Sequence, residues 1–596
     1  MRWRSLDAER STMDKKTIFQ KIRTVLPEVL VLLAVALVLL GNINAKQGYH
    51  MDELLSFELA NGEFNPWIVP TQPQGRLAKF VENEIRGESF GETFDNFVET
   101  IKDVLTNRGS SKLLSYKADV YEEPVWIDRQ TFNDYITVGE QDGFSYLSVY
   151  FNVKDDNHPP LHFMMLHTIS SLFPGEIAPI MGCVINLACV LGIMVLLMRM
   201  GSQVMTLWGM EEWGRLAGLL AAGLYGLSLG AVSTTLLIRM YAMVTLWCVA
   251  ILAVHLQKLY SSKLGGSDFT KNNKVLIAVT VLGFWTQYFF LFYCLILAAV
   301  TAVLLLCKKR TKELLCYVRT MVLAAVLGVA VFPFAIADVF SSGRGVEALE
   351  NLSAGLSGYG GRIMAFAGIL VKELGMSVLL LAIVGLVGIV LVIRKKQWEL
   401  LGLLWIPVAG YFCLAARMSP YLVDRYIMPL FPLLTLNVVV LFYKGLGFWR
   451  IQKTGQKKVR IITVILALLL LTGQVFHVSA YKSDYLYIGY DEQRAVSEAY
   501  KEYPCICVYE GVGYYENLQE FTDYEKTLLV TVPELAERKD TESVEALEQA
   551  VVLVKGGLED EQVVALIQEK YGLYPSMILI EEGAPYGDTI YLFERN

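Results

Sequence analysis

The chain has 596 residues, of which 54% are hydrophobic and only 19% are charged. This composition excludes a soluble globular enzyme, a disordered chain and a collagen-like fibre, and it indicates a polytopic membrane protein with soluble parts. The net charge of −7 is unevenly distributed, because residues 482–596 contain 24 acidic and 9 basic residues. This tail therefore carries −15 and the remainder +8, which argues against a nucleic acid as the partner.

The first apolar run, from Val25 to Ile43, follows a basic N-terminal segment. It is too long for the apolar part of a signal peptide, so we expect an uncleaved helix whose basic end is cytoplasmic. Ten further runs of about 16–24 residues are long enough to cross a bilayer. They are 177–200, 215–237, 240–260, 275–290, 291–307, 315–338, 375–393, 398–416, 426–444 and 461–480. We therefore expect about eleven transmembrane helices, with a turn at Trp285–Phe289 that separates two of them.

Four basic clusters lie in the connectors, at 258–274, 308–312, 394–396 and 444–460. All four are cytoplasmic if the first helix runs from inside to outside and the chain crosses eleven times. The loops 45–160 and 339–362 and the tail then face outward from a multi-pass protein of the cell membrane. The 45–160 loop should contain interfacial helices, since His162–Phe173 at its return is too short to cross. The glycine-rich 339–362 loop is expected to be a flexible connector, with a lid as the alternative.

The tail, residues 481–596, is predicted to be a small extracytoplasmic α/β domain that follows the transmembrane part, residues 1–480. Short β-rich runs at 505–509, 527–532, 550–554, 577–580 and 589–593 alternate with helical patterns such as Glu559–Lys570. Such alternation predicts a parallel or mixed sheet. The tail has no phosphate-binding loop and no nucleophile elbow, so we expect it to support the membrane part or to dock the acceptor.

Charged residues are almost absent from the middle of the apolar runs, which weakens a transporter interpretation. Polar residues instead gather at the outer ends of the runs. Four such groups are His50–Phe57, Asp155–Phe163, Arg239–Tyr241 and Arg417–Tyr426. Each has an ordinary structural explanation as a helix start, a solvated loop or an interfacial anchor. Arginines at outward junctions nevertheless call for an anion there, and a lipid phosphate is the one available.

These residues also carry a resemblance to a known family. The ordered motifs HMDELLSF, DNHPPLHF, RMY, WTQYFF and DRYIMPLFP resemble those of GT-C superfamily membrane glycosyltransferases, in particular the family 39, protein-mannosyltransferase-like branch. The resemblance covers about residues 25–480 and excludes the tail. It implies a GT-C-like fold and a hexosyltransferase that takes a sugar from a polyprenyl-phosphate donor at the outer membrane face, with inversion. The acceptor would be a hydroxyl of a cell-envelope glycan, lipid or protein.

By its match to the acidic motif of the family, Asp52 would be the catalytic base, with Glu53 beside it. Gln287-Tyr288 stands where family members carry His or Tyr, which leaves the role of that position open. A carboxylate can deprotonate the acceptor hydroxyl, and arginines can bind the departing phosphate.

We expect Arg239, Arg425, His158 and Tyr241 to form the phosphate-binding group. Asp155 and Asp156 would face the acceptor, or hold a divalent cation together with Asp52, although we expect no metal. A second carboxylate also leaves hydrolysis open chemically. Two other functions compete with transfer. One is a transporter of lipid-linked saccharides, and the other is a non-catalytic membrane anchor for the tail.

Overall fold

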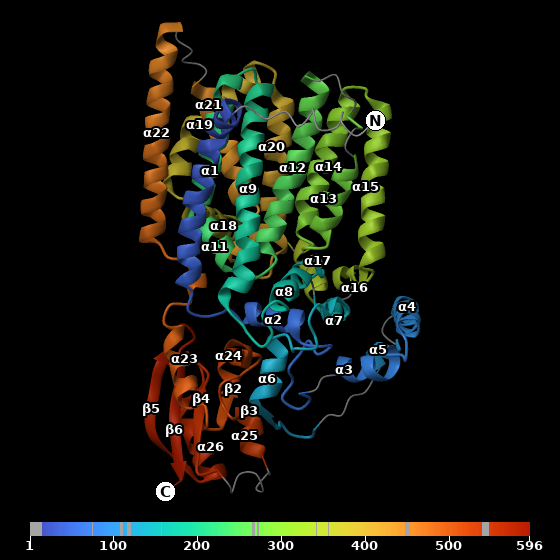
Figure 1. Cartoon of the computed structure of the whole chain (residues 1–596), viewed down its shortest axis with the longest axis vertical. Coiled ribbons are helices and arrows are strands. Elements are labelled where there is room, and N and C mark those ends of the chain that lie inside the picture. The colour runs from blue at the N-terminus through green and yellow to red at the C-terminus, as the bar shows by residue number, and fades with distance from the viewer. Residues whose placement is uncertain are drawn as a thin grey trace, which may run out of the picture.

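The computed structural model describes residues 15–73, 76–107, 111–115, 121–156, 158–264, 269–270, 273–340, 343–353, 355, 357–446, 453–538 and 547–595. Long helices run side by side as a bundle, and a sheet-containing domain lies at one end of it (Figure 1). The protein is thus a polytopic α-helical membrane protein with a small α/β C-terminal domain, as the sequence predicts.

Eight helices of the described chain have the length and apolar composition needed to span a bilayer. They are α1 (Lys15–Asn44), α9 (Pro179–Leu207), α12 (Tyr241–Leu264), α14 (Phe290–Cys307), α15 (Thr311–Val331), α19 (Met376–Arg394), α20 (Trp398–Met418) and α22 (Lys453–Ala480). A ninth unit is bent by 58° between α10 (Gly214–Gly226, preceded by η4, Glu211–Trp213) and α11 (Leu229–Leu236). Two shorter apolar helices, α13 (Asn273–Phe284) and α21 (Leu430–Leu446), bring the segments to the eleven expected from hydropathy.

The long loop after α1 folds into short helices at the end of the bundle where the sheet domain lies (Figure 1). They are α2 (Met51–Asn61), α3 (Arg76–Phe80), η1 (Val81–Ile85), α4 (Phe90–Asn107), α5 (Lys112–Ser115), α6 (Arg129–Ile136), α7 (Tyr146–Asn152), η3 (Val153–Asp155) and α8 (Leu161–Ser170). With 10 residues, α8 is too short to cross a membrane, in agreement with the sequence.

The glycine-rich segment 339–362 was expected to be a flexible connector, and this expectation was wrong for its centre. It contains α17 (Gly343–Ser353), between α16 (Ala335–Phe340) and α18 (Tyr359–Leu374). The glycines lie mainly at the edges of the segment, whereas Glu347–Leu352 is a run of mostly good helix formers. A short 3-10 turn, η5 (Asp424–Ile427), joins α20 to α21 at the same end of the molecule.

The C-terminal domain is built on a mixed six-stranded sheet with the order β1-β3-β2-β4-β6-β5. Strand β2 (Cys505–Tyr509) pairs in parallel with β3 (Lys526–Thr531) and β4 (Gln549–Val554), while β5 (Leu573–Gly583) and β6 (Asp588–Arg595) form an antiparallel hairpin beside β4. Its helices are η7 (Asp484–Leu486), α23 (Tyr490–Ala499), η8 (Gly513–Asn517), α24 (Leu518–Phe521), α25 (Val532–Glu537) and α26 (Asp560–Tyr571). The predicted strands and the helix near 559–570 are confirmed.

One strand of this sheet comes from the loop that follows the first helix. β1 (Trp126–Asp128) pairs antiparallel with β3, so that Trp126 lies opposite Leu528. Helix α6 follows directly, and Phe132 on it contacts Phe521 with ring centroids 5.2 Å apart. The loop and the tail therefore share one sheet edge and one apolar contact.

Candidate functional site

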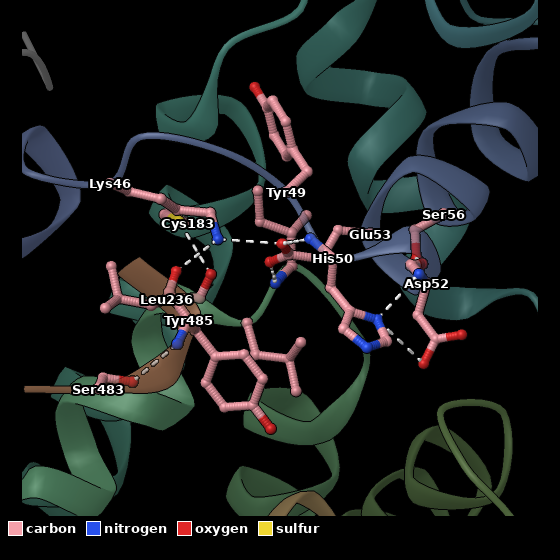
Figure 2. Close-up of polar contacts among 12 residues, drawn as sticks. Lys46, Tyr49, His50, Asp52, Glu53, Ser56, Cys183, Leu236, Ser483 and Tyr485 are labelled. Carbon is pink, nitrogen blue, oxygen red and sulfur yellow. Dashed lines mark hydrogen bonds and ion pairs between the residues drawn. The ribbon is translucent and has the colours of Figure 1, made fainter. Parts of the chain in front are cut away.

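The first predicted cluster lies at the N-terminus of α2, which the link that carries Lys46 and Tyr49 joins to α1 (Figure 2). His50 caps this helix: its Nδ1 accepts the N–H of Asp52 at 3.0 Å, and its own N–H donates to Glu53 Oε2 at 2.7 Å. This reciprocal capping satisfies donors that a helix start leaves free. It also fixes Asp52 and Glu53 in the first turn, where adjacent side chains point about 100° apart.

Glu53 points into the protein and is fully buried. Its Oε2 accepts from Lys46 Nζ at 3.0 Å, and its Oε1 accepts the N–H of Ile238 at 2.7 Å (Figure 2). Burial raises the pKa of Glu53, while the neighbouring Lys46 ammonium acts in the opposite direction. The sequence predicts that Glu53 lies beside the catalytic base. In the structure its carboxylate binds Lys46, the N–H of His50 at the start of α2 and the N–H of Ile238, which directly precedes the RMY motif.

Asp52 points the other way and keeps a side-chain exposure of 23%. Its Oδ2 forms an ion pair with Arg425 Nη1 of η5. Burial raises the pKa of the Asp52 carboxyl, but the two nearby guanidinium groups outweigh this effect and hold the pKa well below its usual range. Burial lowers the pKa of His50 to about 4, so this ring is neutral at pH 7 and its contact with Asp52 is not an ion pair.

Arg239 is the second guanidinium group of the site and is only 4% exposed. Its Nη1 donates to the Asp52 carbonyl oxygen at 3.1 Å and to Ser56 Oγ at 2.9 Å. The Nε atoms of Arg239 and Arg425 are both buried and find no acceptor among the described residues. A buried guanidinium N–H without an acceptor is costly, and an anionic or polar group bound beside the two arginines would satisfy these donors.

The other predicted phosphate ligands are Tyr241 and His158. Tyr241 is 4% exposed, and its ring meets that of Tyr426, next to Arg425, edge to face at 6.2 Å. His158 Nδ1 bonds Asp156 Oδ2 at 2.9 Å. His162, on α8, is fully buried, and its pKa is lowered to about 3 by burial and by the charges of Arg239 and His158.

Of the two predicted acceptor or metal residues, Asp155 and Asp156, the structure describes the side chain of Asp156. Asp156 is partnered by His158, and its charge also acts on the Tyr288 hydroxyl, which donates to Asp338 Oδ2 at 2.6 Å. The side chain of Asp155 lies outside the described part of the structure. Within that part, no three His, Cys, Asp or Glu side chains lie close enough together to hold a metal ion.

Sequence reasoning gave no role to three residues that contact the candidate site, although one of them, Asp424, lies in the fourth motif. Lys46 holds Glu53, Asp424 precedes Arg425, and the Tyr485 hydroxyl donates to Asp424 Oδ1 at 2.6 Å. Arg417, named with Arg425 in the fourth motif, instead donates to the carbonyl oxygens of α17 and the residues after it. A lysine just after a membrane span, such as Lys46, is usually interpreted as an interfacial anchor. No local sequence pattern connects Tyr485 to the other residues of the candidate site.

The arrangement combines a carboxylate with two arginines at one end of a membrane bundle. The carboxylate can accept a proton, and the arginines can bind the oxygens of a phosphate group. Asp52 forms an ion pair with Arg425, and a bound phosphate would compete with it for the same guanidinium group.

The sequence matches no protein-family model and no curated protein. Among the solved structures that are similar are two crystal structures of ArnT from Cupriavidus metallidurans. One, bound to undecaprenyl phosphate, is 12% identical, covers 95% of this chain and 97% of that chain, and gives a TM-score of 0.45. The other, in the apo state, is 12% identical, covers 73% and 87%, and gives a TM-score of 0.38. At this level of similarity, the function follows from the chemistry of the site itself.

Proposed function

We propose that this chain is a GT-C-type membrane glycosyltransferase that moves a sugar from a polyprenyl-phosphate donor to a hydroxyl acceptor. The observation that carries the proposal is the pair Arg239 and Arg425, whose buried Nε atoms have no acceptor among the described residues, beside the Asp52 carboxylate. Guanidinium groups bind phosphate through several N–H donors and stay charged at all working pH values. A lipid-linked phosphate would reach them from the membrane that surrounds the bundle.

The reaction needs no further activation of the donor, because a sugar phosphate already carries a leaving group. The acceptor oxygen attacks the anomeric carbon, and its proton passes to an oxygen of Asp52. The bond between that carbon and the phosphate oxygen breaks, and the polyprenyl phosphate stays on Arg239 and Arg425. Attack from the side opposite the phosphate inverts the anomeric carbon. More specifically, we propose that the transferred sugar is a hexose and that the chain is related to the family 39 branch.

Binding of undecaprenyl phosphate to the purified protein in phosphatidylcholine nanodiscs tests the proposal. Arg239→Ala and Arg425→Ala should each weaken binding by about 2–5 kcal/mol, the scale for truncating one partner of a buried charge pair. Lysine at either position should restore only part of the affinity, since an ammonium group lacks the bidentate fork.

Arg417→Ala is the matched control, because this arginine lies at the same junction but donates to backbone carbonyls. It should bind undecaprenyl phosphate as the parent protein does. Unchanged affinity in both Arg239→Ala and Arg425→Ala would reduce these residues to interfacial anchors and remove the phosphate site from the proposal.

A further inference from the structure

Residues 481–489, the first segment of the C-terminal domain after α22, lie against the link that precedes α2. The N–H of Gln47 donates to the Leu486 carbonyl at 2.8 Å, and Gln47 Oε1 accepts the N–H of Gly489 at 2.6 Å. Lys46 Nζ donates to the Tyr485 carbonyl at 2.8 Å (Figure 2). These bonds attach the segment to the link between α1 and α2, which carries the Lys46–Glu53 ion pair.

The same segment also contacts the bundle on its other side. Ser483 Oγ lies 3.1 Å from Ser233 Oγ of α11, and Ser233 Oγ donates to Glu373 Oε2 of α18 at 3.2 Å. Ser483 also caps the turn η7 by accepting the N–H of Tyr485 at 3.3 Å. Backbone groups and the side chains of Lys46, Gln47 and Ser483 therefore hold the segment, and none of these contacts involves the Tyr485 hydroxyl.

The Tyr485 hydroxyl binds a group on another element. It donates to Asp424 Oδ1 at 2.6 Å, and Asp424 is the neighbour of Arg425. Burial raises the pKa of the Asp424 carboxyl, while the charge of Arg425 acts in the opposite direction, so the two groups lie close enough to influence each other. The charge-assisted hydrogen bond from Tyr485 fixes the direction of this carboxylate. Tyr485 therefore contacts both parts of the candidate site. Its carbonyl oxygen accepts a hydrogen bond from Lys46, just before α2, and its hydroxyl donates one to Asp424 on η5.

We propose that Tyr485 is a positioning residue of the phosphate site, which holds the Asp424 carboxylate so that the Arg425 guanidinium stays directed at Asp52 and at the incoming lipid phosphate. The inference rests on the proposed function, and it makes the first residues after α22 part of the donor site. The C-terminal domain, which was expected only to support the membrane part or to dock the acceptor, then contributes through this segment to donor binding.

Removal of the hydroxyl in Tyr485→Phe leaves the Asp424 carboxylate without its side-chain donor. The carboxylate then turns to Arg425 and neutralises it, so undecaprenyl phosphate should bind about tenfold more weakly to this variant in nanodiscs. Tyr481→Phe is the matched control: it removes a hydroxyl from the same segment, where the Tyr481 ring is 52% exposed and packs on His477. Its affinity should equal that of the parent protein.

The double variant Tyr485→Phe/Asp424→Asn separates positioning from a general loss of structure. Asparagine keeps the shape of the side chain but has no charge to neutralise Arg425, so binding should return to the level of the parent protein. A merely structural tyrosine would give no such recovery. Parent-like binding by Tyr485→Phe, or a double variant as weak as Tyr485→Phe, would overturn the inference.

Arg425→Ala in the same assay distinguishes this failure from that of the proposed function. If Arg425→Ala loses undecaprenyl phosphate and Tyr485→Phe does not, only the role of Tyr485 is wrong. If Arg425→Ala binds as the parent protein does, the phosphate site itself is wrong, and the role of Tyr485 is wrong with it.

Discussion

Asp52 and Glu53 are chemically similar, yet their surroundings give them different tasks. Asp52 is partly exposed and faces two arginines, whereas Glu53 is fully buried and binds Lys46 and two backbone N–H groups. Helix geometry prevents both carboxylates from reaching one hydroxyl. The contacts therefore favour Asp52 as the base and Glu53 as the residue that fixes the start of α2.

Substitution of each carboxylate by its amide should separate these tasks. Asp52→Asn should lose about 10²–10⁴-fold in single-turnover transfer, since the amide cannot take the proton, and it should keep or gain donor affinity because Arg425 loses its partner. Glu53→Gln should lose less turnover and more thermal stability, because it leaves the buried Lys46 ammonium unpaired. Near-normal turnover by Asp52→Asn would direct the search for the base to Asp155 or Asp156.

The ion pair between Asp52 and Arg425 also predicts a pH dependence. In the free protein the two guanidinium groups hold the pKa of Asp52 well below its usual range, so this carboxylate stays ionised throughout the working pH range. A bound phosphate takes up the arginines and neutralises their charge, which should raise the pKa of Asp52. Since the protonated acid cannot act as a base, activity falls below that pKa.

The acid limb of kcat should therefore lie at higher pH than the acid limb of kcat/KM, because the first reports the donor complex and the second the free enzyme. Full pH profiles of both parameters, measured with one donor and one acceptor, test this shift. Acid limbs at the same pH would mean that phosphate does not displace Asp52 from Arg425.

At the residue scale, the sequence identified the groups that carry charge at membrane ends, but not the residues that hold them. Arg239 and Arg425 stand out because arginines are unusual at junctions expected to face outward. Asp52 stands out because it lies in an acidic motif directly after the first span. Lys46 resembles an ordinary interfacial lysine, and Tyr485 is one of 31 tyrosines. Their roles follow from contacts between segments distant in the chain, for which a single sequence has no pattern.

At the scale of elements, hydropathy predicted the bundle because each span must be continuously apolar. The break between α13 and α14 was also predicted, since the turn at Trp285–Phe289 interrupts the apolar pattern. β1 was missed because a three-residue edge strand in a polar loop has no periodicity of its own. Its partner, β3, lies in the C-terminal domain.

Close packing of α9 on α10 depends on glycine. A Cβ atom at Gly218 would lie 2.3 Å from the Met198 carbonyl oxygen and 2.8 Å from Met198 Cα, both backbone atoms. A Cβ atom at Gly201 would lie 2.7 Å from Gly218 Cα. Small residues allow such backbone approach in membrane bundles, where packing drives helix association.

Gly218→Ala should therefore force the two helices apart and destabilise the protein by about 1–3 kcal/mol, the usual cost of overpacking. Gly368→Ala on α18 is the control, because a Cβ atom there meets nothing within 4 Å. It should be neutral or slightly stabilising, since alanine favours helix more than glycine does. Thermal unfolding in detergent distinguishes the two, and equal melting temperatures would show that the α9–α10 contact can widen at little cost.

At the scale of the whole molecule, the candidate site lies at the same end of the bundle as the acidic domain, opposite the basic turns. The short helices of the loop and the sheet domain lie at one end of the bundle, whereas the turns between α14 and α15 and between α19 and α20 lie at the opposite end (Figure 1). Arg239 and Arg425 contact Asp52 of α2 at the first end, and the two turns contain Lys309 and Lys396. An acidic domain and basic turns at opposite ends agree with the positive-inside rule. We therefore expect the site and the C-terminal domain to face outward and the N-terminus of α1 to face the cytoplasm.

Labelling of single cysteines with a membrane-impermeant maleimide tests this orientation. In a background without the exposed Cys307 and Cys413, Ser89→Cys in the loop and Glu561→Cys in the tail should react in intact cells, since both positions are exposed. Lys309→Cys and Lys396→Cys are equally exposed in the protein but should react only after permeabilisation, because the membrane separates them from the reagent. Permeabilised cells provide the control that all four thiols are reactive. Equal labelling of Lys309→Cys, Lys396→Cys and Glu561→Cys in intact cells would contradict the eleven-span orientation and, with it, a donor site on the outer face.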